Sequence, residues 1–183
     1  MRDIVSVGRV AALHPLIRAD VTKAIDTAEK SFPKWIAIRI VQGLRTWDEQ
    51  NALYALGRTK VNPNGKTTKK PMGNIVTRAK GGSSLHNYGL AADFAILVDK
   101  DKNGKYDELS WSMVTDYDKN GVFDWQQVVK AFEDLGFEWG GRWRTFVDNP
   151  HVQKSYGLSW RQLSEMYLAK NFIKDCLYVN VNV

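Results

Sequence analysis

The chain has 183 residues, of which 44% are hydrophobic and 25% are charged, and its formal net charge is +6. This balance is typical of a soluble globular chain, and no apolar run approaches the ~18 residues of a membrane span. The single cysteine, Cys176, excludes an internal disulfide and a zinc site built from several cysteines. The basic charge favours a polyanionic partner, and nucleic acid and an anionic cell-wall polymer both meet that condition.

The first part of the chain predicts a helix, a strand and a second helix. Residues 15–31 begin with a proline and repeat apolar side chains at helical spacing. Residues 35–43 alternate isoleucines with other side chains, as a strand does. Residues 46–57 follow as a short helix, because Thr46 and Glu49 form a capping-box pattern at its start.

The rest of the chain begins with a loop and a strand. Residues 58–82 are rich in Gly, Pro, Asn, Thr and Lys, which predicts a long basic loop with a functional role or, alternatively, a solvated insertion. Residues 89–98 alternate as a strand, with alanines beside Asp93 on its own face. Asp124 is predicted to cap the next helix. The remaining elements are a helix at 124–136, short strands at 137–143 and 151–157, and a helix at 159–170. Helices and strands mix without a β-α-β rhythm, which favours the α+β class.

His86 and Asp93 are the first candidates for a metal site. Zinc accepts imidazole nitrogen and carboxylate oxygen, and a catalytic zinc site uses three protein ligands and a water. The third ligand is His14 or His151, and we favour His151 because His14 precedes a proline at a helix start. The residue types alone leave an alternative open, in which the histidines are hydrogen-bonded structural residues and Asp93 is unrelated to them.

Three ordered motifs together resemble one known family. "SSLHNYGLAAD" contains Ser-x-His-x-x-Gly-x-Ala-x-Asp, "DNPHVQ" supplies Asp-x-x-His, and "GLRTWDEQNALYALGRT" contains an arginine segment. They resemble the zinc peptidases related to D-alanyl-D-alanine carboxypeptidases, and above all the L-alanyl-D-glutamate endopeptidases of phage endolysins and bacilli. The resemblance covers roughly residues 40–165. It implies a single compact peptidase domain over 1–183, with a small antiparallel sheet flanked by helices as in the Hedgehog/D,D-peptidase fold.

The resemblance implies roles for the residues of these motifs. His86, Asp93 and His151 match the zinc ligands of the family. Asp148 matches the acidic residue three positions before the last ligand, which acts as general base on metal-activated water. Glu138 is a rival base, and its alternative role is that of a supporting or surface carboxylate on a strand.

A second group of residues is implied to face the substrate. Arg45 matches the family arginine that holds a carboxylate or stabilises the oxyanion, and its alternative is a surface ion pair. Ser84 and Gln50 are expected to contact substrate or to orient a ligand, while Ser84 also fits simple turn chemistry. Trp143, together with Trp139, lines a wall of the site or packs in the core.

The implied activity is zinc-dependent hydrolysis of a peptidoglycan stem-peptide amide bond, with L-alanyl-D-glutamate as the preferred bond. The alternatives are a D,D- or L,D-carboxypeptidase of the same fold and a non-catalytic cell-wall-binding module. We expect a monomer with neither a nucleic-acid partner nor a membrane partner. The N-terminus shows no secretory signal, which fits cytoplasmic accumulation with release to the cell wall, as for a phage endolysin, or export by another route.

Two further loops share the pattern Asp-x-Asp-x-Asn-Gly with an acid at the ninth position. Alternating oxygen ligands and a glycine at the sharp turn are typical of a calcium loop, although the usual glutamate at position twelve is missing from both. The alternative is an ordinary Asx-Gly turn without any ion. The residues concerned are Asp99, Asp101, Asn103 and Asp107 in the first loop and Asp116, Asp118, Asn120 and Asp124 in the second.

Overall fold

The structure is a computed structural model that describes residues 1–181, so the last two residues of the predicted 1–183 domain lie outside it. The chain forms two compact units. Unit 1 comprises Met1–Leu44 and Gly89–Lys154, and unit 2 comprises Arg45–Tyr88 and Ser155–Val183. The prediction of one domain over the whole chain stays a prediction. Among the described residues, no helix combines the length and the apolarity that crossing a membrane requires.

Unit 1 is built on an antiparallel sheet with the strand order β1-β2-β5-β4, and β3 also pairs with β2. The strands are β1 (Ile36–Gln42), β2 (Ala91–Val98), β3 (Glu108–Ser110), β4 (Glu138–Trp139) and β5 (His151–Gln153). β2 is the central strand, and its residues other than Asp93 are buried. The sheet confirms the predicted small antiparallel arrangement and the α+β class.

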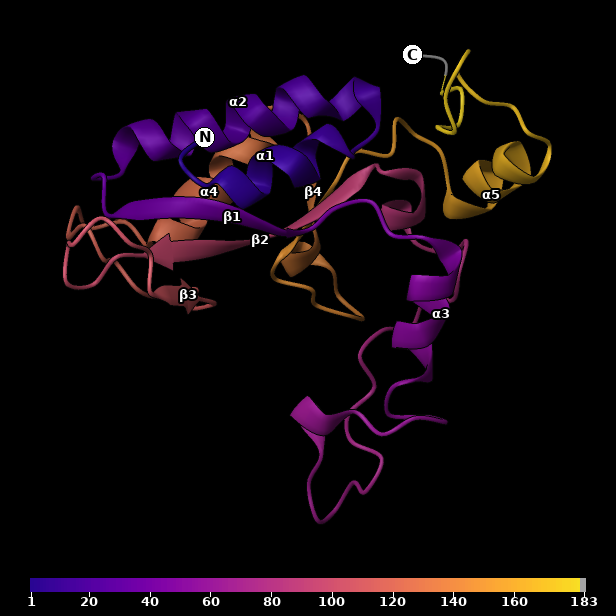
Figure 1. The fold of residues 1–183 in the computed structure, drawn as a ribbon, viewed down its shortest axis with the longest axis horizontal. Helices are drawn as coiled ribbons and strands as arrows, with labels where there is room; N and C mark the ends of the chain where they lie inside the picture. Colours follow the sequence, from indigo (N-terminus) through magenta and orange to yellow (C-terminus); the bar gives the residue numbers. More distant parts are fainter. Residues whose placement is uncertain (182–183) are drawn as a thin grey trace. The chain divides into compact units, whose positions relative to one another are not determined.

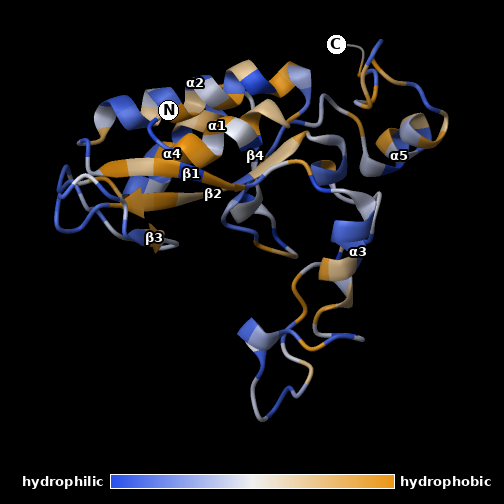
Figure 2. Ribbon diagram, in the orientation of Figure 1, coloured by the Kyte–Doolittle hydropathy of each residue, from blue (hydrophilic) through white to orange (hydrophobic). Residues whose placement is uncertain are grey.

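Three helices cover this sheet in unit 1: α1 (Ile4–Ala11), α2 (Pro15–Ser31) and α4 (Asp124–Glu133). Figure 1 shows α1 and α2 running beside β1, and α2 also packs on α4. The core between helices and sheet contains an aromatic cluster, in which the ring of Phe94 on β2 lies 4.5 Å from Trp125 and 5.9 Å from Phe132 on α4. Figure 2 shows the matching hydrophobic colouring along β1 and β2.

Unit 2 holds α3 (Trp47–Ala55) and α5 (Trp160–Leu168), with short 3₁₀ turns η1 (Pro63–Gly65) and η2 (Leu85–Tyr88). The predicted capping box is present, since Thr46 Oγ1 accepts from Glu49 N and Thr46 N donates to Glu49 Oε2. Tyr167 on α5 stacks on Trp47 with ring centroids 5.1 Å apart. The predicted loop at 58–82 is confirmed, and Asn62 ties its two sides together by donating to the Asn74 carbonyl.

Several boundaries differ from the sequence-based expectations. The predicted cap of α4 is wrong, because Phe123 precedes the helix without a side-chain cap and Asp124 instead accepts a hydrogen bond from Tyr117 N at 2.8 Å. The same helix ends at Glu133, and Gly136 lies beyond it with a φ of +80°, as is typical where a helix stops. Helix α1 and strand β3 were not predicted.

We expect replacement of Asp3 by alanine to lower the free energy of unfolding by about 2 kcal/mol. The buried Asp3 carboxylate caps α1 through Ser6 N and also accepts from Arg39 on β1, with Oδ1 2.8 Å from Nη2. Urea unfolding at neutral pH measures the loss. Asp134→Ala is the control, because its exposed pair with Lys130 contributes only a few tenths of a kcal/mol. Equal losses in both variants would contradict the prediction.

The effect of Asp3 should also depend on pH in a defined direction. Burial disfavours ionisation, but the hydrogen bonds from Arg39 and Ser6 outweigh it and hold the Asp3 pKa below its ordinary value of 3.8. A carboxyl whose pKa is lowered on folding contributes stability above its unfolded pKa, and this is lost as the pH falls through the folded pKa. The difference between wild type and Asp3→Ala should therefore shrink in acid below about pH 4.

Candidate active site

Asp93 and His151 meet because β2 and β5 pair in a register that places them opposite each other. Directly opposed residues of an antiparallel pair project to the same face. His151 Nδ1 lies 3.2 Å from Asp93 Oδ1. Burial of His151 alone would lower its pKa, but the hydrogen bond and the charge of Asp93 outweigh that and raise the pKa above 6.5. The structure thus joins two of the predicted ligands, one on each strand.

The other ring nitrogen of His151 is oriented by a chain of polar side chains on β4 and β5. His151 Nε2 lies 2.9 Å from Gln153 Oε1, and Gln153 Nε2 donates to Glu138 Oε2 at 2.9 Å. A carboxylate only accepts, so Glu138 fixes the amide orientation of Gln153. The amide oxygen then accepts the proton of His151 Nε2, so Nδ1 is the ring nitrogen that faces Asp93 and that would give up its proton to a metal ion. Trp143 completes the chain by donating its indole N–H to Glu138.

Replacing Gln153 by leucine should weaken zinc binding by about 10- to 100-fold, because the partner that sets the histidine tautomer is lost. Competition with a chromophoric zinc chelator measures the affinity directly. Gln126→Leu on α4 is the matched control, since Gln126 is half-buried and lies outside this chain of hydrogen bonds. An unchanged zinc affinity in Gln153→Leu would contradict the positioning role.

Asp148 lies at the start of the short segment that leads into β5. Its backbone N donates to the Gly140 carbonyl at 3.1 Å, and its carbonyl accepts from His151 N at 3.2 Å. Gly140 permits this approach, because a Cβ there would lie only 2.6 Å from the Asp148 carbonyl oxygen. Asp148 is half-buried, and its charge contributes to the raised pKa of His151. Unit 1 therefore places the predicted base next to a predicted ligand.

Within unit 2, the backbone brings His86 and Arg45 together. His86 is buried on η2, and its carbonyl accepts from Arg45 N at 3.0 Å. Arg45 Nη1 donates to Gln50 Oε1 at 2.7 Å, and the fully buried Gln50 donates in turn to the Ala79 carbonyl. Ser84 lies in the turn before η2, where its backbone exchanges hydrogen bonds with Asn87. Gln50 therefore accepts a hydrogen bond directly from the Arg45 guanidinium.

The donor atoms of the three predicted ligands form one group. One possible ligand atom from each of His86, Asp93 and His151 lies within 4.8 Å of those of the other two. His14 is not part of the group, since it precedes α2 as the cap residue and its Nδ1 accepts from Leu16 N. Two imidazoles and one carboxylate fit zinc, which takes these donor types at catalytic sites. This donor set is one that the catalytic sites of zinc hydrolases use.

Comparison with known proteins identifies the family. A family model described as D-alanyl-D-alanine carboxypeptidase matches residues 77–154. The chain is 43% identical over 143 residues to the peptidoglycan L-alanyl-D-glutamate endopeptidase CwlK of Bacillus subtilis, covering 77% of this chain and 72% of CwlK. The chain belongs to the D-alanyl-D-alanine carboxypeptidase-related family of zinc peptidases, as its motifs predicted.

Two further proteins are similar to the chain. The L-alanyl-D-glutamate peptidase of Listeria phage A118 is 33% identical over 114 residues, covering 62% of this chain and 34% of the phage protein. The match thus spans about a third of the phage protein. A crystal structure of the Serratia marcescens L-Ala D-Glu endopeptidase ChiX aligns with a TM-score of 0.47 and 20% identity, over 88% of this chain and 91% of that chain.

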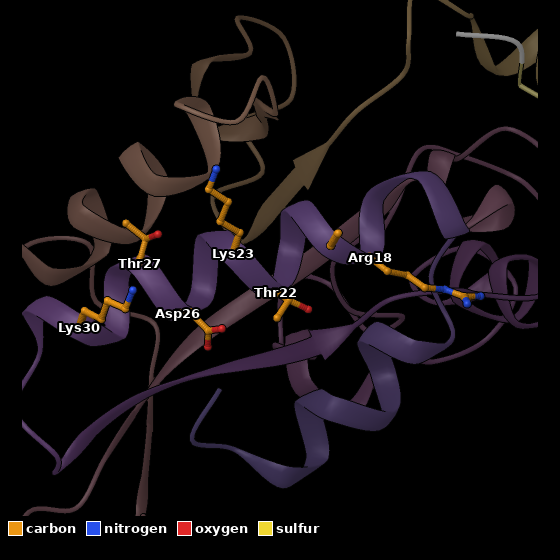
Figure 3. A pocket seen from close by; sticks show the side chains of 7 residues that line it. Arg18, Thr22, Lys23, Asp26, Thr27 and Lys30 are labelled. Carbon is orange, nitrogen blue, oxygen red and sulfur yellow. The ribbon is translucent and has the colours of Figure 1, made fainter.

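A surface hollow elsewhere in unit 1 contains none of the candidate active-site residues. Figure 3 shows that its lining side chains all come from α2, between Arg18 and Lys30. Apart from Ala19, they are cationic and hydroxyl side chains with one carboxylate, Asp26, which pairs with the N-terminal ammonium group. The hollow therefore lies apart from the candidate ligands on β2 and β5.

Proposed function

We propose that this chain is a zinc-dependent peptidoglycan endopeptidase that cleaves the L-alanyl-D-glutamate bond of the stem peptide. The grouping of His86, Asp93 and His151 carries the proposal, because it supplies the three protein ligands of a catalytic zinc site. The similarity to CwlK supports the choice of bond, since that relative is named for it and the match covers most of both chains. The net charge of +6 suits an anionic cell wall.

The roles of the chain's own residues follow from their positions. A zinc ion held by the three ligands would polarise the scissile carbonyl and lower the pKa of a bound water. Asp148 is the general base, which takes the proton of the attacking water and later delivers one to the leaving amine. Arg45 binds a substrate carboxylate or the developing oxyanion, and the buried Gln50 amide holds its guanidinium in place.

The remaining predicted residues take supporting roles in this proposal. Glu138 is bonded to Gln153 and to Trp143, which suits an orienting carboxylate better than a base. The Trp143 ring lies 5.1 Å from the His151 ring, so it can shield the ligand and present a wall to substrate. Ser84 is a turn residue that offers its hydroxyl to substrate. We also propose that the protein is a monomer and that it is released to the cell wall.

Digestion of purified muropeptides by the zinc-loaded protein tests the proposed function. Mass spectrometry should find a free L-alanine carboxylate on the glycan side and a new amino-terminal D-glutamate on the released peptide. Loss of a terminal D-alanine instead would establish the carboxypeptidase alternative. No product from zinc-loaded protein, together with retention on purified cell walls, would establish the binding-module alternative.

A further inference from the structure

The two Asp-x-Asp-x-Asn-Gly loops adopt the same backbone conformation. In the second loop, the Asp116 carboxylate accepts from Asn120 N at 3.2 Å and from Gly121 N at 2.8 Å. In the first loop, Asp99 accepts from the corresponding Asn103 N at 3.1 Å and Gly104 N at 2.7 Å. The first carboxylates of the two loops therefore accept the same pair of backbone hydrogen bonds, although Asp99 is buried and Asp116 is half-buried.

The loops differ at the ninth position. Asp107 of the first loop is exposed, and its Oδ1 accepts from Lys100 N. Asp124 of the second loop is completely buried; its Oδ2 accepts from Tyr117 N, but its Oδ1 has no hydrogen-bond partner. A buried carboxylate oxygen without a partner costs free energy that a bound cation would recover. Only the second loop presents this unsatisfied ligand.

The unsatisfied carboxylate belongs to a cluster of acids. One oxygen from each of Asp116, Asp118 and Asp124 lies within 4.8 Å of the others, whereas the first loop forms no such group within the described residues. The three carboxylates therefore concentrate negative charge beside the buried oxygen of Asp124. A divalent cation would neutralise that charge.

We propose that residues 116–124 bind one calcium ion through Asp116, Asp118 and Asp124. These carboxylates occupy loop positions 1, 3 and 9, and Asn120 at position 5 offers its amide oxygen. An all-oxygen set suits calcium, whereas magnesium needs near-ideal octahedral geometry and zinc prefers nitrogen or sulfur. Gln127 stands at position 12 in place of the bidentate glutamate, so we expect a dissociation constant of about 10⁻⁴ to 10⁻³ M.

The site would stabilise the start of α4 in unit 1. Asp124 is the first residue of α4, and the next residue, Trp125, is fully buried against Phe94. A calcium ion bound to Asp124 therefore links loop 116–121 to the helix that packs on β2. This inference is independent of the proposed peptidase activity, because its ligands include none of the zinc ligands.

Calcium titration of the full-length, zinc-loaded protein tests the site. Isothermal titration at pH 7.5 should show one saturable site per chain, and 10 mM CaCl₂ should raise Tm by about 5 °C. Asp118→Asn should weaken binding at least about 10-fold and reduce the rise in Tm, since one anionic ligand is lost. Asp101→Asn changes the same position of the first loop and should keep both responses at the wild-type level.

A second variant separates the loss of a calcium ligand from misfolding of Asp118→Asn. Asp124→Asn retains the acceptor for Tyr117 N and should also reduce the calcium-dependent rise in Tm, and circular dichroism should show wild-type secondary structure. The absence of saturable calcium binding in wild type up to 10 mM (about ten times the weakest expected constant) would overturn the proposal. A loss of binding in Asp101→Asn as large as that in Asp118→Asn would also overturn it.

Discussion

Asp148→Asn should lower kcat on purified muropeptides by about 10²- to 10⁴-fold while leaving the zinc content at the wild-type level. Asparagine has the same shape as aspartate but cannot accept a proton from the attacking water. The fold around the position should persist, because the backbone N of Asp148 holds the Gly140 carbonyl and its carbonyl accepts from His151 N. Steady-state kinetics on a defined muropeptide, with zinc measured by atomic emission, check both parts of this expectation.

Glu138→Gln separates the two candidate bases. Glu138 accepts hydrogen bonds from Trp143 and Gln153, and glutamine keeps one acceptor oxygen for them. We therefore expect Glu138→Gln to affect zinc affinity more than kcat at saturating zinc. If Asp148→Asn cleaves as fast as wild type while Glu138→Gln is inactive with bound zinc, the base is Glu138 and not Asp148.

Asp93→Asn should reduce bound zinc from one ion per chain to well below one after dialysis against a mild chelator, and activity should fall with it. The change removes the single anionic ligand of the proposed set but leaves a side chain of the same size opposite His151. Loss of a partner that only orients a ligand costs about 10- to 100-fold in affinity, so loss of a ligand should cost more than that.

Asp101→Asn is the control for this experiment as well, because it is an exposed aspartate of similar chemistry outside the set. Thermal unfolding of both variants in the presence of chelator separates a metal effect from a fold effect. Stoichiometric zinc in dialysed Asp93→Asn would contradict the assignment of Asp93 as a ligand.

The fold was predictable from sequence wherever an element carried a periodic pattern and a local start signal. Residues 15–31 have both and form α2 with those bounds, and Thr46 with Glu49 forms the predicted capping box. Helix α1 was missed because its eight residues leave Ile4, Val5 and Val7 exposed, which blurs the apolar stripe. Strand β3 has three residues, too few for any period to appear.

The site was predictable to the extent that it depends on residue type and motif spacing. The motifs predicted His86, Asp93 and His151 as ligands, and Gln153 lies two positions after His151, as residues on one face of a strand do. The role of Gln153 was missed, because it depends on the pairing of β4 with β5, which sets Glu138 opposite Gln153. The Asp124 cap was wrong for a similar reason, since the bond from Tyr117 N depends on how the preceding loop folds back.

The pairing of Asp93 with His151 has a consequence for the order of folding. These two residues are 58 positions apart, and they meet only when β5 pairs with β2. Closing that long segment lowers the conformational entropy of the chain, and it must happen before one ion can reach both ligands. Metal binding therefore belongs to the late steps of folding. Bound zinc would then stabilise the pairing of β5 with β2 and slow its opening far more than the fraying of α1.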